Sequence, residues 1–349
     1  MSGLFDIESY DYSLPEELIA QNPATPRDSS RLMILDRASG AITHRQFYDL
    51  GKCLRPGDLL VLNDTRVMRA RLHGVKLHGG ARVEILLLKA LDGGRKEWEA
   101  LVKPGRRLRR GTLISLSDGT ELTVGERTAA GDGVRSVLFP DGVDVDELLD
   151  RIGETPLPPY ITRSDAPASA YQTVFAAHDG SSAAPTASLH FTEALLERVK
   201  DETGVSITWV TLHVGLGTFR PVKCSDIRDH VIHHESCMVP RETAELVRET
   251  KRRGGRVIAS GTTVARTLES MAIPGDVIRS GKMETGLFIY PGYEFVLTDC
   301  LLTNFHLPRS SLLMLVSAFA GRDVIKRAYE TAVDMRYRFF SFGDAMFIH

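Results

Sequence analysis

Short apolar runs alternate with turn-forming residues from Gly57 to about Pro140. Pairs such as Asp118-Gly119 separate the runs, and such pairs favour tight turns between strands. No segment with helical periodicity lies between them. About seven strands in succession therefore predict a small barrel or sandwich. The runs occupy residues 59–63, 70–77, 82–91, 97–104, 112–117, 121–126 and 134–139.

From residue 144 onward, helical patterns alternate with strand-like ones. Predicted helices occupy 144–152, 192–201, 240–253, 262–271 and a C-terminal region over 311–334, and predicted strands occupy 205–214, 256–260 and 287–290. The helix over 240–253 has clear end signals, because Pro240 stands at its first position and Gly254 follows its last basic residues. This alternation predicts an α/β layer with a largely parallel sheet.

The N-terminal segment through Leu54 has a strand pattern over 32–35 and is expected to pack with this α/β layer. We therefore predict the α/β class, with a large α/β domain whose sheet is mixed or largely parallel. A small antiparallel β-barrel domain is inserted into it. The predicted catalytic domain comprises residues 1–57 and 151–349, and the predicted barrel domain comprises residues 58–150.

Composition and charge restrict the class of protein. The 349 residues are 43% hydrophobic and 25% charged, which is typical of a globular chain. The net charge of −2 means that a nucleic acid would have to be held by a local basic patch. The longest apolar run, Ser311–Gly321, is shorter than the ~20 residues of a membrane helix, and no secretory signal is visible. Because the four cysteines are scattered, we expect a reducing compartment and a soluble cytoplasmic protein.

The segment 256–269 reads as a buried strand, a Gly261-Thr262-Thr263 turn and a helix. Exposed amides and threonine hydroxyls at a helix N-terminus suit an anion or another polar ligand. A plain strand-to-helix loop with a threonine cap is the alternative. The segment is not a Walker A loop, because no Gly-Lys-Ser/Thr sequence follows.

Three histidines and a carboxylate stand close together as His230, His233, His234 and Glu235. Such a group can bind zinc or carry out acid–base chemistry. Its spacing matches neither H-E-x-x-H nor H-x-x-E-H. Exposed or loop-packed histidines therefore remain the alternative.

Three further histidines, His190, His213 and His306, stand at predicted strand or loop ends. Asn304 lies near His306, and Arg220 follows His213 across a glycine-rich turn. An isolated histidine is commonly a packed core residue, but strand ends of an α/β layer are where ligand crevices form. These residues are therefore candidates for a site.

A basic run lies in the β-rich part of the chain between Lys103 and Gly111. It contains no acid and has turn residues at both ends, so it is suited to grip a phosphate backbone. A solvated hairpin is the alternative. Its cations are Lys103, Arg106, Arg107, Arg109 and Arg110.

These stretches together resemble the S-adenosylmethionine:tRNA ribosyltransferase-isomerase family of queuosine biosynthesis. The resemblance extends from about Tyr10 to Ile348 and includes many long matches in the same order. The most specific are YDYSLPEELIAQNP (10–23), RDSSRLMILD (27–36), GDLLVLNDTRV (57–67), AAPTASLHFT (183–192), TLHVGLGTFRPV (211–222), GTTVARTLE (261–269), FIYPGYEF (288–295) and LLTNFHLPRSSLLMLVSAFAG (301–321).

The resemblance implies a monomeric enzyme with an α/β domain and an inserted β-barrel. It implies that the ribosyl part of S-adenosylmethionine passes to the aminomethyl group of 7-aminomethyl-7-deazaguanine (preQ1) at the wobble position of tRNA. Rearrangement of the sugar gives epoxyqueuosine in the tRNA, and adenine and methionine are released. No metal or cofactor is implied, since S-adenosylmethionine is consumed as a substrate.

This chemistry needs a base for the acidified ribose C5′–H, an acid for the adenine, and a pocket closed to water. The acid and the base cannot be told apart from sequence. The candidate catalytic residues are His190, His213, His233, Glu235 and His306. The candidate substrate-binding residues are Asp64, Arg66, Arg220, Thr262, Thr263, Arg266 and Asn304, and the basic run is the candidate tRNA-binding segment.

Some positions depart from the expected family pattern. An arginine is usual at Ala170, a glycine at Ser188, a valine at Ser260, a methionine at Ile232 and a polar residue at Gly286. Ala170 matters most, because the loss of a guanidinium would weaken a phosphate or carboxylate contact. It supports the main alternative, a non-catalytic tRNA-binding paralogue. A zinc hydrolase built on His230, His233 and Glu235 is a further alternative.

Overall fold

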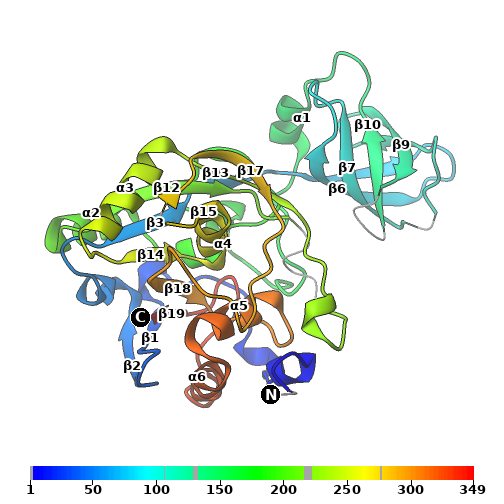
Figure 1. Ribbon diagram of the computed structural model, residues 1–349. Coiled ribbons are helices and arrows are strands. Elements are labelled where there is room, and N and C mark those ends of the chain that lie inside the picture. The colour runs from blue at the N-terminus through cyan, green and yellow to red at the C-terminus, as the bar shows by residue number, and fades with distance from the viewer. Residues whose placement is uncertain (1–2, 106, 129–132, 216–221, 276) are drawn as a thin grey trace. The chain divides into compact units, whose positions relative to one another are not determined.

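The computed structural model describes residues 3–105, 107–128, 133–215, 222–275 and 277–349 (Figure 1). Tertiary contacts divide the chain into two compact units. The sheet unit comprises Met1–Arg66, Pro158–His178 and Ala184–His349, and the barrel unit comprises Val67–Leu157 and Asp179–Ala183. The N-terminal segment contributes strands to the sheet unit, as expected.

A nine-stranded mixed sheet forms the centre of the sheet unit (Figure 1). Its order is β17 (Gly281–Thr285), β13 (Glu235–Val239), β12 (Ser206–Leu212), β3 (Leu59–Asn63), β14 (Val257–Ser260), β18 (Cys300–Asn304), β19 (Ala345–Ile348), β1 (Arg31–Leu35) and β2 (Ile42–Gln46). The four strands β12, β3, β14 and β18 are parallel to one another. Their carboxyl ends therefore lie along one edge of the sheet.

Strand β3 is a correction to the sequence analysis, which assigned residues 59–63 to the β-rich domain. Leu60 pairs with Ile207 of β12 and with Ile258 of β14, so β3 is a central strand of the large sheet. All five of its residues are buried. A continuous apolar run of this kind is typical of a parallel strand covered on both faces, whereas an antiparallel barrel strand alternates. The sequence LLVLN carries that signal.

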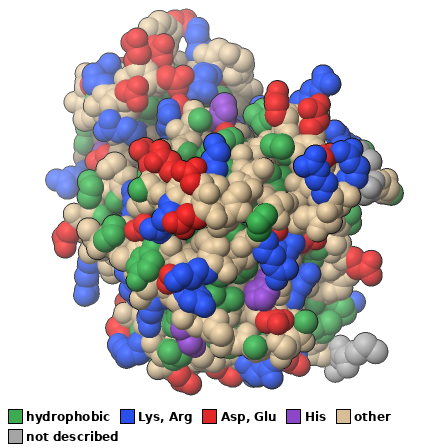
Figure 2. All heavy atoms as spheres, turned by 90° about the vertical axis from the view of Figure 1, so that its left-hand side faces the viewer, with side chains coloured by type: hydrophobic (Ala, Val, Ile, Leu, Met, Phe, Trp, Pro, Cys, Tyr) green, Lys and Arg blue, Asp and Glu red, His purple; other side chains and the backbone are tan. Residues whose placement is uncertain are grey.

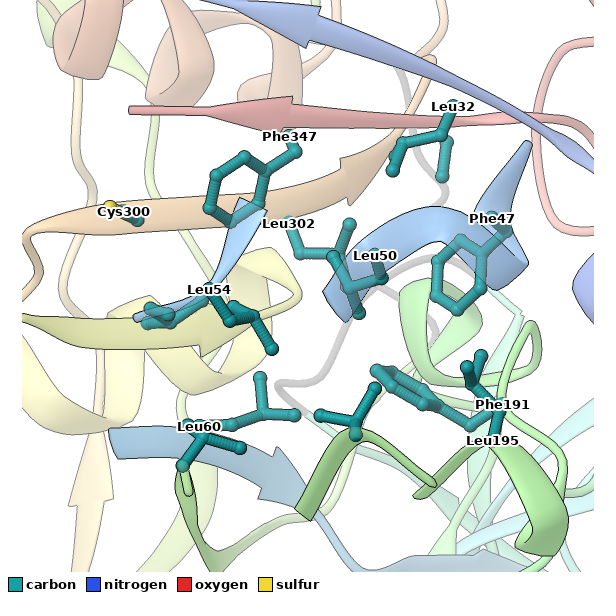
Figure 3. Packing of buried hydrophobic residues seen from close by; sticks show 14 of the residues in the cluster. Leu32, Phe47, Leu50, Leu54, Leu60, Phe191, Leu195, Cys300, Leu302 and Phe347 are labelled. Atoms are coloured by element: carbon teal, nitrogen blue, oxygen red, sulfur yellow. The ribbon is translucent and has the colours of Figure 1, made fainter. Parts of the chain in front are cut away.

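The two faces of the sheet are covered by different elements. Leu60 and Leu62 pack in a cluster with the 3-10 helix η4 (Phe47–Cys53) and with α2 (Glu193–Thr203), as Figure 3 shows in part. Thr208 of β12 is in register with Val61, and both side chains point to the face opposite to that of Leu60 and Leu62. The Thr208 hydroxyl lies 2.7 Å from the Thr243 hydroxyl on α3 (Arg241–Arg252). Helix α3 therefore covers the second face.

In the part of the sheet unit that the structure describes, the remaining α-helices are α4 (Thr262–Met271), α5 (Ser311–Ala320) and α6 (Arg322–Asp334). The expected helical region over 311–334 is confirmed, and it consists of two helices. They are divided at Gly321, whose φ of 89° falls outside the helical range. Among the described residues, no helix is long and apolar enough to cross a membrane.

The barrel unit contains a closed antiparallel barrel followed by helix α1 (Val145–Ile152) (Figure 1). Alternate residues of its strands are buried, as in β7 with Trp98, Ala100 and Val102. This confirms the predicted fold class. The barrel order is β10 (Val134–Leu138), β7 (Glu97–Lys103), β6 (Arg82–Ala90), β5 (Arg71–Lys76), β8 (Leu113–Leu116) and β9 (Glu121–Arg127).

The predicted strand over 287–290 is wrong. Residues 286–290 are irregular, and the strand of this region is β17, which ends at Thr285. β17 was missed because its sequence GKMET lacks a run of apolar residues. Two short two-stranded sheets complete the fold, β4 (Thr65–Val67) with β11 (His178–Ser181) and β15 (Ala272–Ile273) with β16 (Val277–Ile278).

Candidate active site

Polar residues follow the four parallel strands at their carboxyl ends. Asp64 follows β3, His213 follows β12, Thr262 lies just beyond β14, and Asn304 ends β18. In open α/β sheets, ligands bind in the crevice outside these strand ends. The structure thus brings candidates from four separate sequence stretches to one edge of the sheet.

Asn63, which the sequence analysis did not single out, ties three of these ends together. Its amide nitrogen donates to the Leu212 carbonyl at 3.1 Å and to the Thr263 hydroxyl at 3.3 Å. Its amide oxygen accepts the Leu212 N–H at 3.1 Å. The side chain is fully buried, so these bonds are not exchanged with water. Asn63 therefore fixes the spacing of β3, β12 and the start of α4.

Asp64 is a buried carboxylate at the end of β3. It accepts a hydrogen bond of 2.6 Å from the Thr211 hydroxyl, and its other oxygen lies 3.5 Å from His178 Nε2. Burial raises the pKa of Asp64, and the Thr211 bond and the His178 charge oppose this effect. A carboxyl group with a raised pKa is suited to proton transfer. His178 and Thr211 are site residues that the sequence analysis missed.

His213 is half-buried just beyond the end of β12. Its Nδ1 lies 2.8 Å from the Thr65 hydroxyl, and its backbone N–H donates to the Ser236 carbonyl at 3.0 Å. A hydrogen bond at a ring nitrogen fixes the orientation of the side chain, which general acid–base catalysis requires. The neighbouring candidate Arg66 is exposed and donates to the Ala176 carbonyl at 2.8 Å.

Glu235 and Arg266 form an ion pair in the interior of the sheet unit. Glu235 begins β13, which runs antiparallel to β12 and therefore starts beside the end of that strand. It also accepts the Gly215 N–H at 2.8 Å. Arg266 comes from α4 and donates through Nε to the Leu287 carbonyl at 3.1 Å. Glu235 is only 6% exposed and Arg266 only 3%, so each buried charge needs the other to offset the cost of its removal from water.

The other members of the histidine run do not join this pair. His233 and His234 are exposed, and His230 packs edge-on against Phe288. Burial lowers the pKa of His230, with a contribution from His233. In the part of the chain that the structure describes, no group of three His, Cys, Asp or Glu residues is placed to share a metal ion. The arrangement therefore gives no support to a zinc hydrolase.

His190 and His306 are buried near Asn304, at the end of β18. His190 Nδ1 lies 2.7 Å from the Ser30 hydroxyl, and the Asn304 amide donates to Nε2 at 3.1 Å. Burial lowers the pKa of His190 to about 4, against a weaker opposing effect from Asp344. Because Nε2 accepts, the proton of the neutral ring sits on Nδ1.

His306 follows Asn304 by two residues and is likewise buried. Its Nε2 lies 2.8 Å from the Thr303 hydroxyl, and its backbone N–H donates to the Tyr329 hydroxyl at 2.9 Å. Burial lowers the pKa of His306 to about 3. Both buried histidines are therefore neutral at physiological pH.

The start of α4 carries the two candidate threonines. Gly261 has a φ of 104°, which only glycine adopts readily, and it turns the chain from β14 into the helix. Thr262 and Thr263 are both buried there, and Thr263 accepts the bond from Asn63. Arg220, the remaining substrate-binding candidate, lies outside the described residues.

Ala170, the most notable departure from the family pattern, lies beside Arg27. The Arg27 guanidinium donates to the carbonyls of Gln172, Ser169 and Ala170 at 2.6, 3.1 and 3.2 Å. Ala170 and Arg27 both line an open pocket of about 410 Å³. This segment therefore has a guanidinium supplied from another part of the chain.

The basic run begins with Lys103, the last residue of β7, and continues towards β8 of the barrel unit. Its described cations are all exposed, and two are paired, Lys103 with Glu84 at 3.5 Å and Arg110 with Glu126 at 2.7 Å. Arg106 lies outside the described residues. Elsewhere, on the face shown in Figure 2, basic and acidic side chains are interspersed, in keeping with the small net charge.

Comparisons with known proteins agree on one family. The model of a family described as "Queuosine biosynthesis protein" matches residues 7–348. An S-adenosylmethionine:tRNA ribosyltransferase-isomerase of Thermosipho africanus is 54% identical over 98% of this chain and 99% of its own. One of Halothermothrix orenii is 50% identical over the same shares. The crystal structure of an S-adenosylmethionine tRNA ribosyltransferase from Thermotoga maritima is similar with a TM-score of 0.55 and 41% identity, over 98% of this chain and 100% of that one.

Proposed function

Since the chain belongs to the S-adenosylmethionine:tRNA ribosyltransferase-isomerase family of queuosine biosynthesis, we propose that it acts on preQ1 at the wobble position of tRNA. The enzyme is a transferase-isomerase. In the proposed reaction the ribosyl group of S-adenosylmethionine moves to the aminomethyl nitrogen and is isomerised. The products are epoxyqueuosine-tRNA, adenine and methionine. No metal or other cofactor takes part, and the chain works as a monomer.

The reaction requires three proton movements. A base removes the ribose C5′–H that the sulfonium acidifies, an acid protonates adenine as it leaves, and the attacking amine loses a proton. General acid–base groups held within reach of these atoms typically contribute roughly 10²–10⁴-fold each. The observation that best supports the proposal is the set of fixed polar side chains at the ends of adjacent parallel strands.

His213 is the proposed proton-transfer residue. It is half-buried, so a substrate can reach it, and the Thr65 hydroxyl 2.8 Å from Nδ1 sets its orientation. Asp64 is the second titratable group at this edge, and burial raises the pKa of its carboxyl group above the ordinary value, which suits it to proton transfer. The exposed His233 has no comparable hydrogen bond among the described residues, which makes it the weaker candidate.

The remaining candidate residues bind the substrates or hold other residues of the site in place. His190 and His306 are neutral at pH 7, so they act as hydrogen-bonding groups that hold Asn304 and the end of β18 in place. Thr262 and Thr263 offer hydroxyls and backbone amides to substrate oxygens at the start of α4. The exposed cations of the basic run, including Arg107 and Arg109, hold the anticodon phosphates.

Turnover with two matched tRNAs tests the proposal. The purified chain is incubated with S-adenosylmethionine and a tRNA carrying preQ1, and adenine and the modified nucleoside are followed by mass spectrometry. The same tRNA with guanine at the wobble position is the control. We expect adenine and epoxyqueuosine in equal amounts from the first tRNA only. A folded protein that binds the preQ1-tRNA without releasing adenine would instead be the non-catalytic paralogue suggested by Ala170.

A further inference from the structure

A small pocket in the sheet unit collects residues from four stretches that are far apart in the sequence. It is lined by Ile232 from the histidine run, Arg266 from α4, Phe288 and Ile289 from the segment after β17, and Ser311, Leu312 and Leu315 from α5. Ile232 is one of the departures from the expected family pattern, and the other three stretches lie in the matching segments 261–269, 288–295 and 301–321. All lining residues but Arg266 and Ser311 are apolar, so these two residues supply the polar side chains of the lining.

Arg266 has a donor that its own contacts leave unused. Nε donates to the Leu287 carbonyl, and Nη1 pairs with Glu235. Nη2 is buried and has no hydrogen-bond partner among the described residues. A buried guanidinium donor without an acceptor is costly, and an acceptor on a ligand would satisfy it. The bonds at Nε and Nη1 hold the guanidinium plane in a fixed orientation.

The first turn of α5 lines the same pocket. Ser310 caps the helix, and its hydroxyl accepts the Leu313 N–H at 3.2 Å. Ser311 and Leu312 are the first two residues of the ten-residue helix. Amides in this position have no acceptor within the helix, and the helix dipole is positive there. Such an end attracts anions, and Arg266 supplies a second donor beside it.

The charges decide which kind of ligand fits. Glu235 neutralises most of the Arg266 charge, so the pocket does not attract a strongly charged group such as a phosphate. The α5 N-terminus adds a partial positive charge of about half a unit, which favours a single negative charge. A carboxylate has that charge, and its two oxygens match one guanidinium donor and one helix amide. The apolar walls suit the aliphatic carbons next to it.

We propose that this pocket binds the carboxylate of the methionine part of S-adenosylmethionine, held between Arg266 Nη2 and the N-terminus of α5. The inference rests on the proposed function and assigns a substrate group to a defined subsite. It also gives α5 a role in the site, which its position in the sequence did not suggest. Arg266 then discriminates for the carboxylate group rather than for the ribose.

Two forms of the substrate test the proposal with the full chain and preQ1-tRNA. kcat/KM is measured for S-adenosylmethionine and for its decarboxylated analogue, which has the same sulfonium and ribose. Wild type should prefer S-adenosylmethionine by at least roughly tenfold, the value of one charge-assisted hydrogen bond. In Arg266→Lys, which keeps the charge but loses the second donor, this preference should fall to about threefold or less. The analogue itself should be used almost as well as by wild type.

A matched control is Arg256→Lys. Arg256 also forms an ion pair with a buried aspartate, Asp58, but it lies just before β14, away from the carboxyl end. Its substitution should leave the preference unchanged. If Arg266→Lys does not fold, Leu312→Glu provides a second variant, since it places a competing carboxylate on the pocket wall and should reduce the preference equally.

An equal use of both substrates by wild type, or an unchanged preference in Arg266→Lys, would overturn the carboxylate subsite. Loss of activity to the same extent with both substrates would also overturn it, because it would mean that Arg266 acts on the fold alone. If wild type fails to turn over S-adenosylmethionine at all, the proposed function fails instead. The two failures are therefore distinguishable.

Discussion

The hydroxyls of Ser188 and Ser260 lie 3.2 Å apart in the buried interior, where neither side chain has any exposed surface. Both positions depart from the expected family pattern, which has glycine and valine there. Ser188 belongs to the 3-10 helix η6 (Thr186–Ser188), and Ser260 ends β14 directly before Gly261. Each hydroxyl is therefore the hydrogen-bond partner of the other.

This pairing predicts non-additive stability. Ser188→Gly or Ser260→Val alone leaves one buried hydroxyl without its partner and should cost about 1–3 kcal/mol in the free energy of unfolding. The double variant removes both hydroxyls and should cost less than the sum by about 1 kcal/mol. Urea denaturation of all four proteins measures this coupling. Additive effects would mean that the two hydroxyls do not stabilise each other.

The buried histidines predict a loss of stability in acid. The pKa of His190 is lowered to about 4 and that of His306 to about 3, so the folded state keeps both rings neutral while the unfolded state protonates near about pH 6.5. Their contribution is therefore complete above that pH and is lost as the pH falls towards 4 and 3. Each histidine adds up to about 1.4 kcal/mol per pH unit to the slope.

His190→Gln and His306→Gln should flatten this slope. Denaturation midpoints at about pH 7.5 and about pH 5 give the comparison, because these values lie on either side of the pKa of an unfolded histidine. Exposed His233→Gln is the matched control. An equal acid sensitivity in wild type and both buried variants would show that the acid transition comes from other groups.

The Glu235–Arg266 pair predicts a different kind of coupling. Removing one partner by Glu235→Gln or Arg266→Met leaves a buried charge uncompensated and should destabilise the fold by about 3 kcal/mol or more. Combining both substitutions removes both charges and should recover part of that loss. Thermal unfolding of the three variants tests this. A double variant as unstable as the sum would contradict mutual charge compensation.

The basic run predicts a change in salt dependence. Charge reversal at the exposed residues Arg107 and Arg109 should raise the KM for tRNA. It should reduce the slope of log affinity against log salt concentration by about 0.7–0.9 for each phosphate that the protein no longer neutralises. Arg82→Glu, an exposed residue of the barrel strand β6, is the control. A slope that does not change would place the tRNA on another surface.

Local patterns were enough to predict the barrel and most helices, because turn pairs and helix caps act over a few residues. The strand over 59–63 was misplaced because the partners of a strand depend on the whole chain, although its continuous apolar run LLVLN is typical of a central parallel strand. β17 was missed for the opposite reason, since GKMET has no apolar signal.

The residues of the candidate site could be predicted from their chemistry, but the contacts between them could not. His213, Glu235 and Arg266 were chosen for their chemistry, whereas the ion pair depends on β13 lying antiparallel to β12. Asn63 was overlooked, although a polar residue that ends a buried strand before Asp64 is a usable signal. Exposure separates His213 from His233, and no single sequence carries that information.

The most direct test of the central claim is a single-turnover measurement of adenine release from S-adenosylmethionine with preQ1-tRNA. Wild type is compared with His213→Gln, which retains a polar side chain near Thr65. We predict a rate at least roughly 100-fold lower for the variant, with unchanged unfolding and tRNA affinity. A variant that releases adenine at the wild-type rate would contradict the assignment of proton transfer to the carboxyl ends of these strands.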